Sequence, residues 1–182
     1  MNRIVALIIC LALALGVAAA ETAAPKTQLG TLKVRGAFAL QCALPKGYTL
    51  ETIENEDSYC HAVLKSADGT KPELTIRIAF NEMASGLERL NDASDEAIAN
   101  IEATFRAEDT VDISYMETAH GTKIMVVKEV RDNVDFVDFY TIYKGYEVEI
   151  VLHQVNPGDA GITDDQIQMA IDFLSDLDFI EA

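Results

Sequence analysis

The sequence predicts an α+β domain that has a mainly antiparallel sheet, two principal helices packed on it and one disulfide. Apolar and polar residues alternate in several short segments, a period that is typical of half-buried strands. Two other segments place apolar residues three or four positions apart behind a capping residue, which indicates amphipathic helices. Two cysteines remain once an apolar N-terminal segment is set aside.

Residues 1–20 have the three-part pattern of a secretory signal peptide. A short polar start precedes the apolar run 4–15, and Ala18 and Ala20 occupy the positions that a signal peptidase reads. We therefore expect an exported protein, periplasmic or secreted, that is cleaved after Ala20 and has no membrane segment afterwards. An uncleaved anchor stays open as the alternative, because residues 4–20 are just long enough to span a bilayer.

Composition and charge limit what the mature chain can be. The full sequence has 182 residues, of which 49% are apolar, and this is enough for a hydrophobic core. We expect a disordered lead-in over residues 21–30 and a single domain over residues 31–182. The chain carries 30 acidic and 14 basic side chains, for a net charge of −16. Nucleic acids and anionic membranes need clustered Lys and Arg, so this charge argues against both as partners.

Three strands are predicted in the first half of the domain. Residues 32–44 alternate as one strand with a bend at Gly36, and further strands are expected near residues 58–64 and over 73–80. The acidic stretch 51–57 predicts an exposed loop or a helical turn.

The two remaining cysteines, Cys42 and Cys60, lie at the end of the first predicted strand and the start of the second. In an exported chain two cysteines most simply form one structural disulfide, which here would close a loop of about 18 residues. A redox-active pair is the alternative, but the sequence lacks the Cys-x-x-Cys spacing that is typical of such centres.

Capping residues mark the two helices. Ser94 precedes the first helix, and Thr163 with Gln166 forms a capping box at the start of the last helix. Their apolar stripes are Ile98, Ile101 and Phe105 in the first, and Ile167, Ala170, Ile171 and Leu174 in the second.

Two hairpins are predicted between these helices. The first has a two-residue turn at His120-Gly121 between residues 112–118 and 123–130, which would place Tyr115 opposite Val126.

The second hairpin turns at Lys144-Gly145, between residues 134–143 and 146–155. In that register one face is apolar and packs on the core. The other face carries Phe136, Asp138, Tyr140, Ile142, Glu147, Glu149 and His153.

Aromatic and apolar side chains around the second hairpin form a candidate interaction face of Phe136, Tyr140, Ile142, Tyr143 and Tyr146. Tyrosines are enriched at interfaces because they combine apolar area with a hydroxyl, although strand aromatics also commonly belong to the core. Either a helix covers the strip of Phe136, Tyr140 and Ile142, or that strip is exposed and binds a partner.

The segment Phe38-Ala39-Leu40 leads to Leu44-Pro45-Lys46-Gly47-Tyr48, and the strand 73–80 precedes a helix. Later, Tyr143-Lys144-Gly145-Tyr146 joins two strands, and a terminal helix runs on to Leu177-Asp178-Phe179. This order of elements resembles the Mog1/PsbP-like family of small α+β domains.

The resemblance covers about residues 32–180 and implies a non-enzymatic adaptor or accessory role, as in the Ran-binding and photosystem-associated members. No binding residue of the family carries over to this chain, because its members share an architecture rather than a motif.

No catalytic motif is present, so we expect neither an enzyme nor a cofactor. The sequence has no Gly-x-Ser-x-Gly elbow, P-loop or His-Glu-x-x-His pair. The histidines His61, His120 and His153 lie at outward strand positions or in a turn, which does not favour the convergent ligands that zinc needs.

Asp159, Asp164 and Asp165 flank a glycine before the last helix and are weak calcium candidates, since calcium prefers oxygen ligands. They lack EF-hand spacing, and a solvated acidic surface is the favoured explanation. The sequence therefore predicts an exported accessory or protein-interaction domain with a protein partner. The alternative is a periplasmic module that binds calcium or a small ligand.

Overall fold

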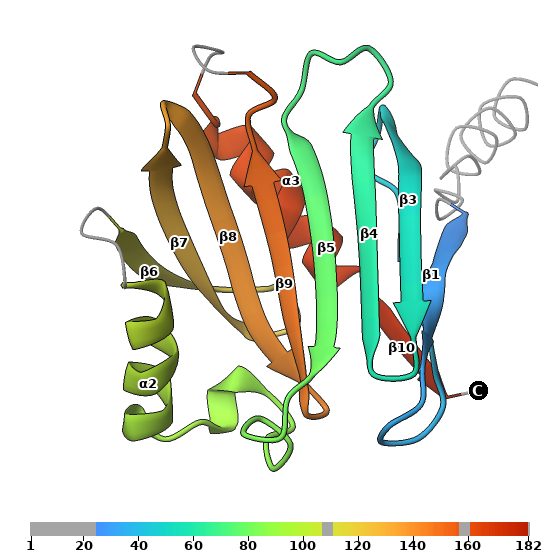
Figure 1. Ribbon diagram of the computed structural model, residues 1–182, viewed down its shortest axis with the longest axis vertical. Helices are drawn as coiled ribbons and strands as arrows, with labels where there is room; N and C mark the ends of the chain where they lie inside the picture. Colours follow the sequence, from blue (N-terminus) through green and yellow to red (C-terminus); the bar gives the residue numbers. More distant parts are fainter. Residues whose placement is uncertain (1–24, 107–110, 157–160, 182) are drawn as a thin grey trace, which may run out of the picture.

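The computed structural model describes residues 25–106, 111–156 and 161–181 (Figure 1). Strands β1 to β10 form two sheets, and two α-helices and a short 3-10 turn complete the described part of the chain. The structure is sheet-rich, with 51% strand and 18% helix, and no disulfide joins the cysteines that it describes. The predicted class, an α+β domain with one disulfide, is therefore corrected to a sheet-rich fold, and the disulfide is wrong.

The larger sheet has seven antiparallel strands in the order β3-β4-β5-β9-β8-β7-β6. In that order they are β3 (Tyr48–Glu56), β4 (Tyr59–Ser66), β5 (Glu73–Phe80), β9 (Tyr146–His153), β8 (Val134–Tyr143), β7 (Lys123–Arg131) and β6 (Asp112–Glu117). Successive side chains of a strand point to opposite faces, so each strand supplies both a core face and an outer face.

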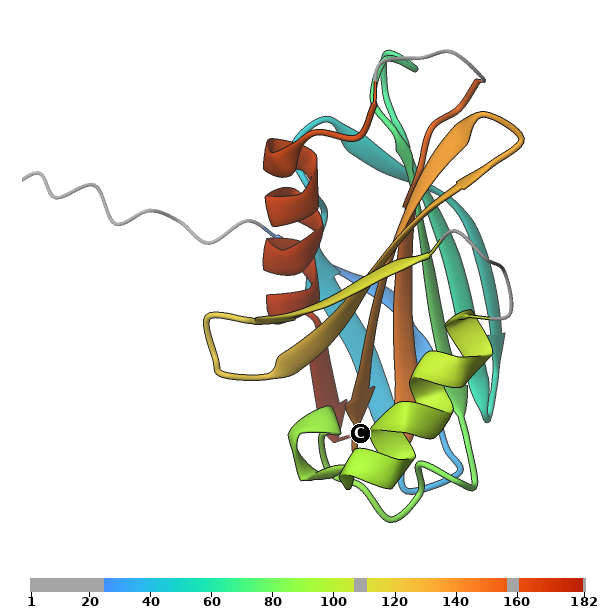
Figure 2. The same ribbon diagram turned by 90° about the vertical axis from the view of Figure 1, so that its left-hand side faces the viewer.

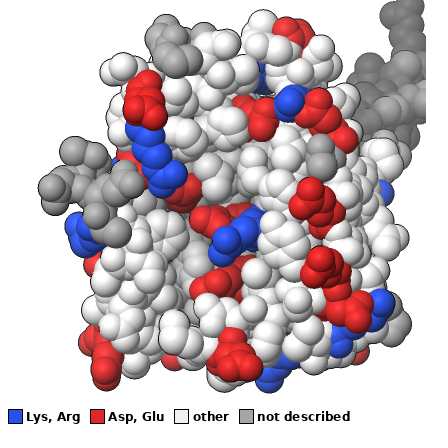
Figure 3. Space-filling view, in the orientation of Figure 1, with Lys and Arg blue, Asp and Glu red and all other residues white. Residues whose placement is uncertain are grey.

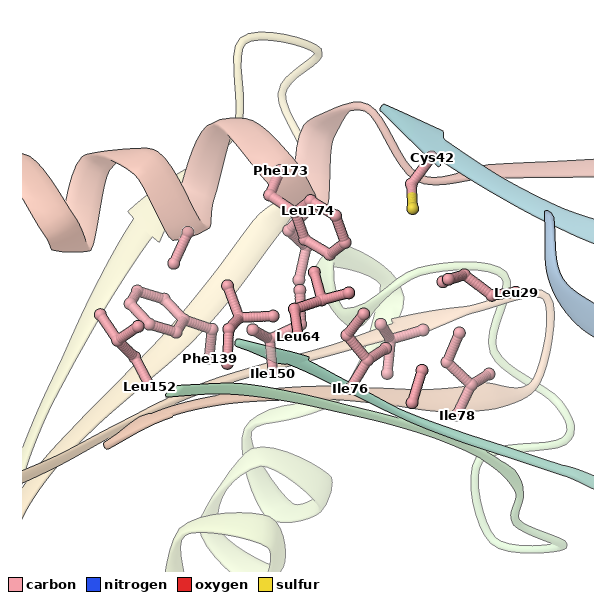
Figure 4. Packing of buried hydrophobic residues seen from close by; sticks show 14 of the residues in the cluster. Leu29, Cys42, Leu64, Ile76, Ile78, Phe139, Ile150, Leu152, Phe173 and Leu174 are labelled. Carbon is pink, nitrogen blue, oxygen red and sulfur yellow. The ribbon is translucent and has the colours of Figure 1, made fainter. Parts of the chain in front are cut away.

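The inner face of the large sheet is covered by helix α3 (Asp164–Ser175) and by a second, three-stranded sheet. That sheet consists of β1 (Lys26–Leu32), β2 (Phe38–Ala43) and β10 (Asp178–Glu181), in the order β1-β2-β10. Apolar side chains from both sheets and α3 meet in one buried core, in which Phe173 and Leu174 of α3 lie over Phe139 and Ile150 of the large sheet (Figure 4).

The outer face of the large sheet carries helix α2 (Asp95–Phe105), on the opposite side from α3 (Figure 2). The segment before α2 contains the 3-10 turn η1 (Leu90–Asp92). A second apolar cluster lies here, between α2 and strands β6, β7 and β8. The large sheet therefore has one layer on each face.

The N-terminal strands differ from the prediction. The stretch 32–44 is not one bent strand, because the chain reverses between β1 and β2, where Gly36 has φ +113°. Residues 26–30, expected in a disordered lead-in, lie in β1. The acidic stretch 51–57, expected to be a loop or helical turn, lies mostly in β3. As an edge strand of its sheet, β3 can carry exposed charges without cost to a neighbouring strand.

The predicted disulfide is wrong, because Cys42 and Cys60 are free, buried thiols. Cys42 is on β2 and Cys60 on β4, so they belong to different sheets, and the Cys60 thiol donates to the carbonyl oxygen of Leu29 at 3.6 Å. Burial raises the pKa of Cys42 to about 12 and that of Cys60 to about 11. Both side chains therefore act as small apolar core residues that stay protonated at neutral pH.

The turn at Lys144-Gly145 is confirmed, since Tyr143 pairs with Tyr146 across it. The predicted turn at His120-Gly121 is wrong by one residue, and Tyr115 pairs with Met125 instead of Val126. The Thr118 hydroxyl accepts hydrogen bonds from the backbone N–H groups of residues 120 and 122, which stabilises a wider loop.

Both predicted helix caps are confirmed. The Ser94 hydroxyl accepts from the backbone N–H of Ala97, and Thr163 and Gln166 form a reciprocal capping box. Within the described ranges, no helix combines the length and the apolar character that crossing a membrane requires. The predicted signal peptide lies outside these ranges.

Candidate functional site

The five residues of the predicted interaction face do not form one surface. Phe136, Tyr140 and Ile142 lie on the outer face of β8, whereas Tyr143 and Tyr146 pack with the inner core. Tyr140 and Ile142 are only 5% and 1% exposed, because α2 and the segment before it cover them. The alternative left open by the sequence is thus resolved, since a helix covers most of the strip.

Tyr143 and Tyr146 serve the core through contacts with aromatic rings. Tyr146 lies against Phe38, Phe80 and Phe179, and the ring of Tyr143 is 4.5 Å from that of Phe179. These two tyrosines therefore have a structural explanation that needs no partner.

The cover provided by α2 is incomplete. None of its eleven residues is buried, and a cleft of about 370 Å³ remains between α2, the segment before it and the outer face of strands β5, β8 and β9. Its apolar wall consists of Met83, Ala84, Leu87, Ala97, Ile101, Phe105 and Ile142. Its polar floor includes Arg77, Asn81, Tyr140, Glu147 and Glu149. We call this space the α2 cleft.

Strand register builds the floor. Arg77 on β5 pairs with Glu149 on β9, and Glu149 pairs with Tyr140 on β8, so these three side chains form one row across the sheet. Glu147, two residues from Glu149, points to the same face. Charged side chains accordingly gather over the middle of the sheet, beside α2 (Figure 3).

Hydrogen bonds fix the two carboxylates of the floor. The Tyr140 hydroxyl and the Asn81 amide each donate to Oε1 of Glu147 at 2.8 Å. The Nε of Arg77 lies 3.0 Å from Oε2 of Glu149. Burial and the hydrogen bond to Glu147 raise the pKa of Tyr140, so its hydroxyl remains a donor at physiological pH. The floor is therefore preorganised and holds two carboxylates against one guanidinium.

A further acidic group lies beside the cleft on the same face. Asp138 is 5% exposed, and burial, followed by the charges of Glu149 and Glu129, raises its pKa to about 7 despite the nearby Arg131. Glu129 forms an ion pair with Arg131. This part of the outer face therefore changes its charge near neutral pH.

The histidines do not converge with one another. The Nε2 atom of His153 lies 3.3 Å from Oε1 of Glu73, and the His153 ring stacks on that of Phe136. The Nδ1 atom of His61 lies 3.9 Å from Oε2 of Glu54. His120 is in the loop between β6 and β7.

The calcium candidates have a structural role where they are described. Asp164 and Asp165 occupy the first turn of α3, where negative charge stabilises the helix N-terminus, and Asp159 lies outside the described residues. Among the residues that the structure describes, no group of three His, Cys, Asp or Glu side chains is placed to hold a metal ion.

Sequence reasoning missed the cleft but not all of its residues. The hairpin register predicts Glu147 and Glu149 on the outer face of the sheet, but no local pattern links Arg77 and Asn81 to these two residues. That link depends on the pairing of β5 with β9, which joins segments about 70 residues apart. Compared with known proteins, the sequence matches no family model, and no curated protein is significantly similar to it.

Proposed function

We propose that this protein is an exported, non-enzymatic protein-interaction domain whose α2 cleft receives a side chain of its partner. The observation that carries the proposal is the cleft itself, with an apolar wall opposite a preorganised polar floor. Binding sites commonly combine apolar lining with a few fixed polar groups in this way.

The chemistry of the lining supports binding rather than a reaction. Within the described residues, no serine, cysteine or histidine lines the cleft. Among the described lining residues, the hydroxyl of Thr104 donates to the carbonyl oxygen of Ile101 within α2, and that of Tyr140 donates to Glu147. Glu147 and Glu149 are held by hydrogen bonds and an ion pair, as expected for groups that orient a ligand.

Export is part of the proposal and rests on residues 1–20, whose pattern is that of a signal peptide. The accessory role rests on the resemblance to the Mog1/PsbP-like family and stays a prediction. The strongly acidic chain favours a basic protein partner over nucleic acid or an anionic membrane.

Filling the cleft tests the proposal. Ala97→Phe would place a ring in the cleft, whereas Ala99→Phe would add the same ring to an exposed position of α2 outside it. We expect wild type and Ala99→Phe to capture the same partner from an exported protein fraction, and Ala97→Phe to lose it while retaining its thermal midpoint. Capture that is unchanged by Ala97→Phe, or no capture by the wild type, would contradict the proposal.

A small-ligand module is the second candidate, and the size of the cleft favours it. Small-molecule sites occupy roughly 300–1,000 Å³, and this cleft lies at the lower end of that range. Native mass spectrometry distinguishes the two. A low-mass compound bound to wild type and Ala99→Phe but absent from Ala97→Phe would favour the small ligand over the protein partner.

A further inference from the structure

We propose that the α2 cleft selects a lysine side chain of the partner, whose ammonium group binds Glu147. This inference rests on the proposed function and names the residue type that the cleft would take. Three properties of the cleft carry it: its charge, the free oxygen of Glu147 and the apolar wall.

The charge of the floor favours a cation. Arg77 is paired with Glu149 in the same row of the sheet, which leaves the carboxylate of Glu147 without a cationic partner among the described residues. An incoming anion would meet two carboxylates, whereas an incoming cation would neutralise the one that is unpaired. The net charge of −16 also attracts basic segments over longer distances.

The geometry of Glu147 favours an ammonium group over a guanidinium. Its Oε1 already accepts from both Tyr140 and Asn81, while Oε2 has no donor among the described residues. A guanidinium binds a carboxylate best through both oxygens, but a lysine ammonium is a point charge that needs only one. The remaining protons of the ammonium can bind water at the open side of the cleft.

The apolar wall suits the aliphatic stem of lysine. Met83, Leu87 and Ile101 offer contact surface for methylene groups, which long cationic side chains commonly pack against apolar neighbours. Phe105 and Tyr140 lie edge to face, with ring centroids 5.8 Å apart, and both line the cleft.

Short blocked peptides test the selection directly. The probes are acetyl-Gly-Leu-X-Leu-Gly-amide in which X is lysine, norleucine, arginine or glutamate, and binding is followed by NMR on the isotope-labelled full protein. We expect the lysine peptide to shift signals of the cleft and to bind about tenfold tighter than the norleucine peptide, since it adds a charged hydrogen bond. Arginine should bind more weakly than lysine, and glutamate most weakly.

Variants of the protein assign the effect to one carboxylate. Glu147→Gln should reduce the affinity for the lysine peptide to that for norleucine, whereas Glu82→Gln, an exposed acid outside the cleft, should leave the tenfold difference intact. Added salt should weaken binding of the lysine peptide but leave that of the neutral norleucine peptide unchanged.

Equal affinities for lysine and norleucine, or tighter binding of arginine or glutamate, would overturn the inference. If these peptides still shift cleft signals, the proposed function stands without lysine selection. If no peptide binds while Ala97→Phe still abolishes partner capture, lysine selection is likewise overturned and the interaction domain stands.

Discussion

The two helices cover opposite faces of the same sheet in different ways (Figure 2). Helix α3 buries five residues against the inner face, whereas α2 buries none against the outer face. The inner face is closed by a continuous apolar core, and the outer face retains a cleft with a charged floor. The face that its helix covers less completely is therefore the one with room for a ligand.

Strand alternation explains the difference. On β8 and β9 the inward residues, such as Phe139 and Ile150, are apolar and let a helix pack without leaving polar groups unpaired. The outward residues include Glu147 and Glu149, whose full burial would cost free energy unless each was paired. A helix over this face can therefore contact only its apolar margin, and α2 lies there.

The largest expected effect is a difference between the two helices in how much each contributes to the free energy of unfolding. Ile171 on α3 is 2% exposed, whereas Ile101 on α2 is only half-buried. Ile171→Ala should lower the free energy of unfolding by about 2–5 kcal/mol, and Ile101→Ala by about 1 kcal/mol or less. Urea denaturation of both variants measures this difference, and equal losses would show that α2 is packed as firmly as α3.

A second prediction concerns the charge of the outer face. The pKa of Asp138 is about 7 in the folded protein and 3.8 ordinarily, so between about pH 4 and pH 7 only the folded state keeps this proton. Stability should therefore fall as the pH rises through this window, and Asp138→Asn should remove the fall. We expect the variant to be more stable than wild type by about 1–3 kcal/mol at pH 8 and similar to it at pH 4.

Thermal or urea unfolding from pH 4 to pH 8 checks this prediction. The same fall in both proteins would mean that Asp138 ionises normally, and the outer face would then be better hydrated than its burial indicates.

The smallest effect concerns the helix caps. Thr163→Ala should cost about 1 kcal/mol of global stability, a usual value for a lost N-cap. Ser94→Ala removes the equivalent hydrogen bond from α2, but its global cost cannot exceed the free energy with which α2 docks, so we expect a smaller loss. Urea denaturation compares the two, and a larger loss from Ser94→Ala would contradict the weak docking of α2.

Local signals in the sequence predicted local structure. The caps at Ser94 and Thr163 and the turn at Lys144-Gly145 depend on residues within a few positions of each other, and all three are confirmed. The strand β3 was missed because its charges suggested a loop, although an edge strand tolerates them. The cysteines were misassigned because their number and spacing indicate a disulfide, while their burial in two different sheets is not visible in the sequence.

The candidate site was predictable only in part. The hairpin register placed Tyr140, Glu147 and Glu149 on one face, and the structure brings them together in the cleft. Arg77 and Asn81 join them because β5 lies next to β9, and such long-range pairing follows from the whole topology rather than from any local pattern. Of the five residues predicted as an interaction face, three lie on the outer face of β8 and two pack with the inner core, a division that depends on how the whole chain folds.

Native-state hydrogen exchange of the unliganded protein tests the central claim most directly, because it measures how firmly each helix is held. We predict that the most protected amides of α2 exchange about a hundredfold faster than those of α3, which corresponds to a difference of about 2.7 kcal/mol in opening free energy. Equal protection of α2 and α3 would contradict the account, since both faces of the sheet would then be closed to the same degree.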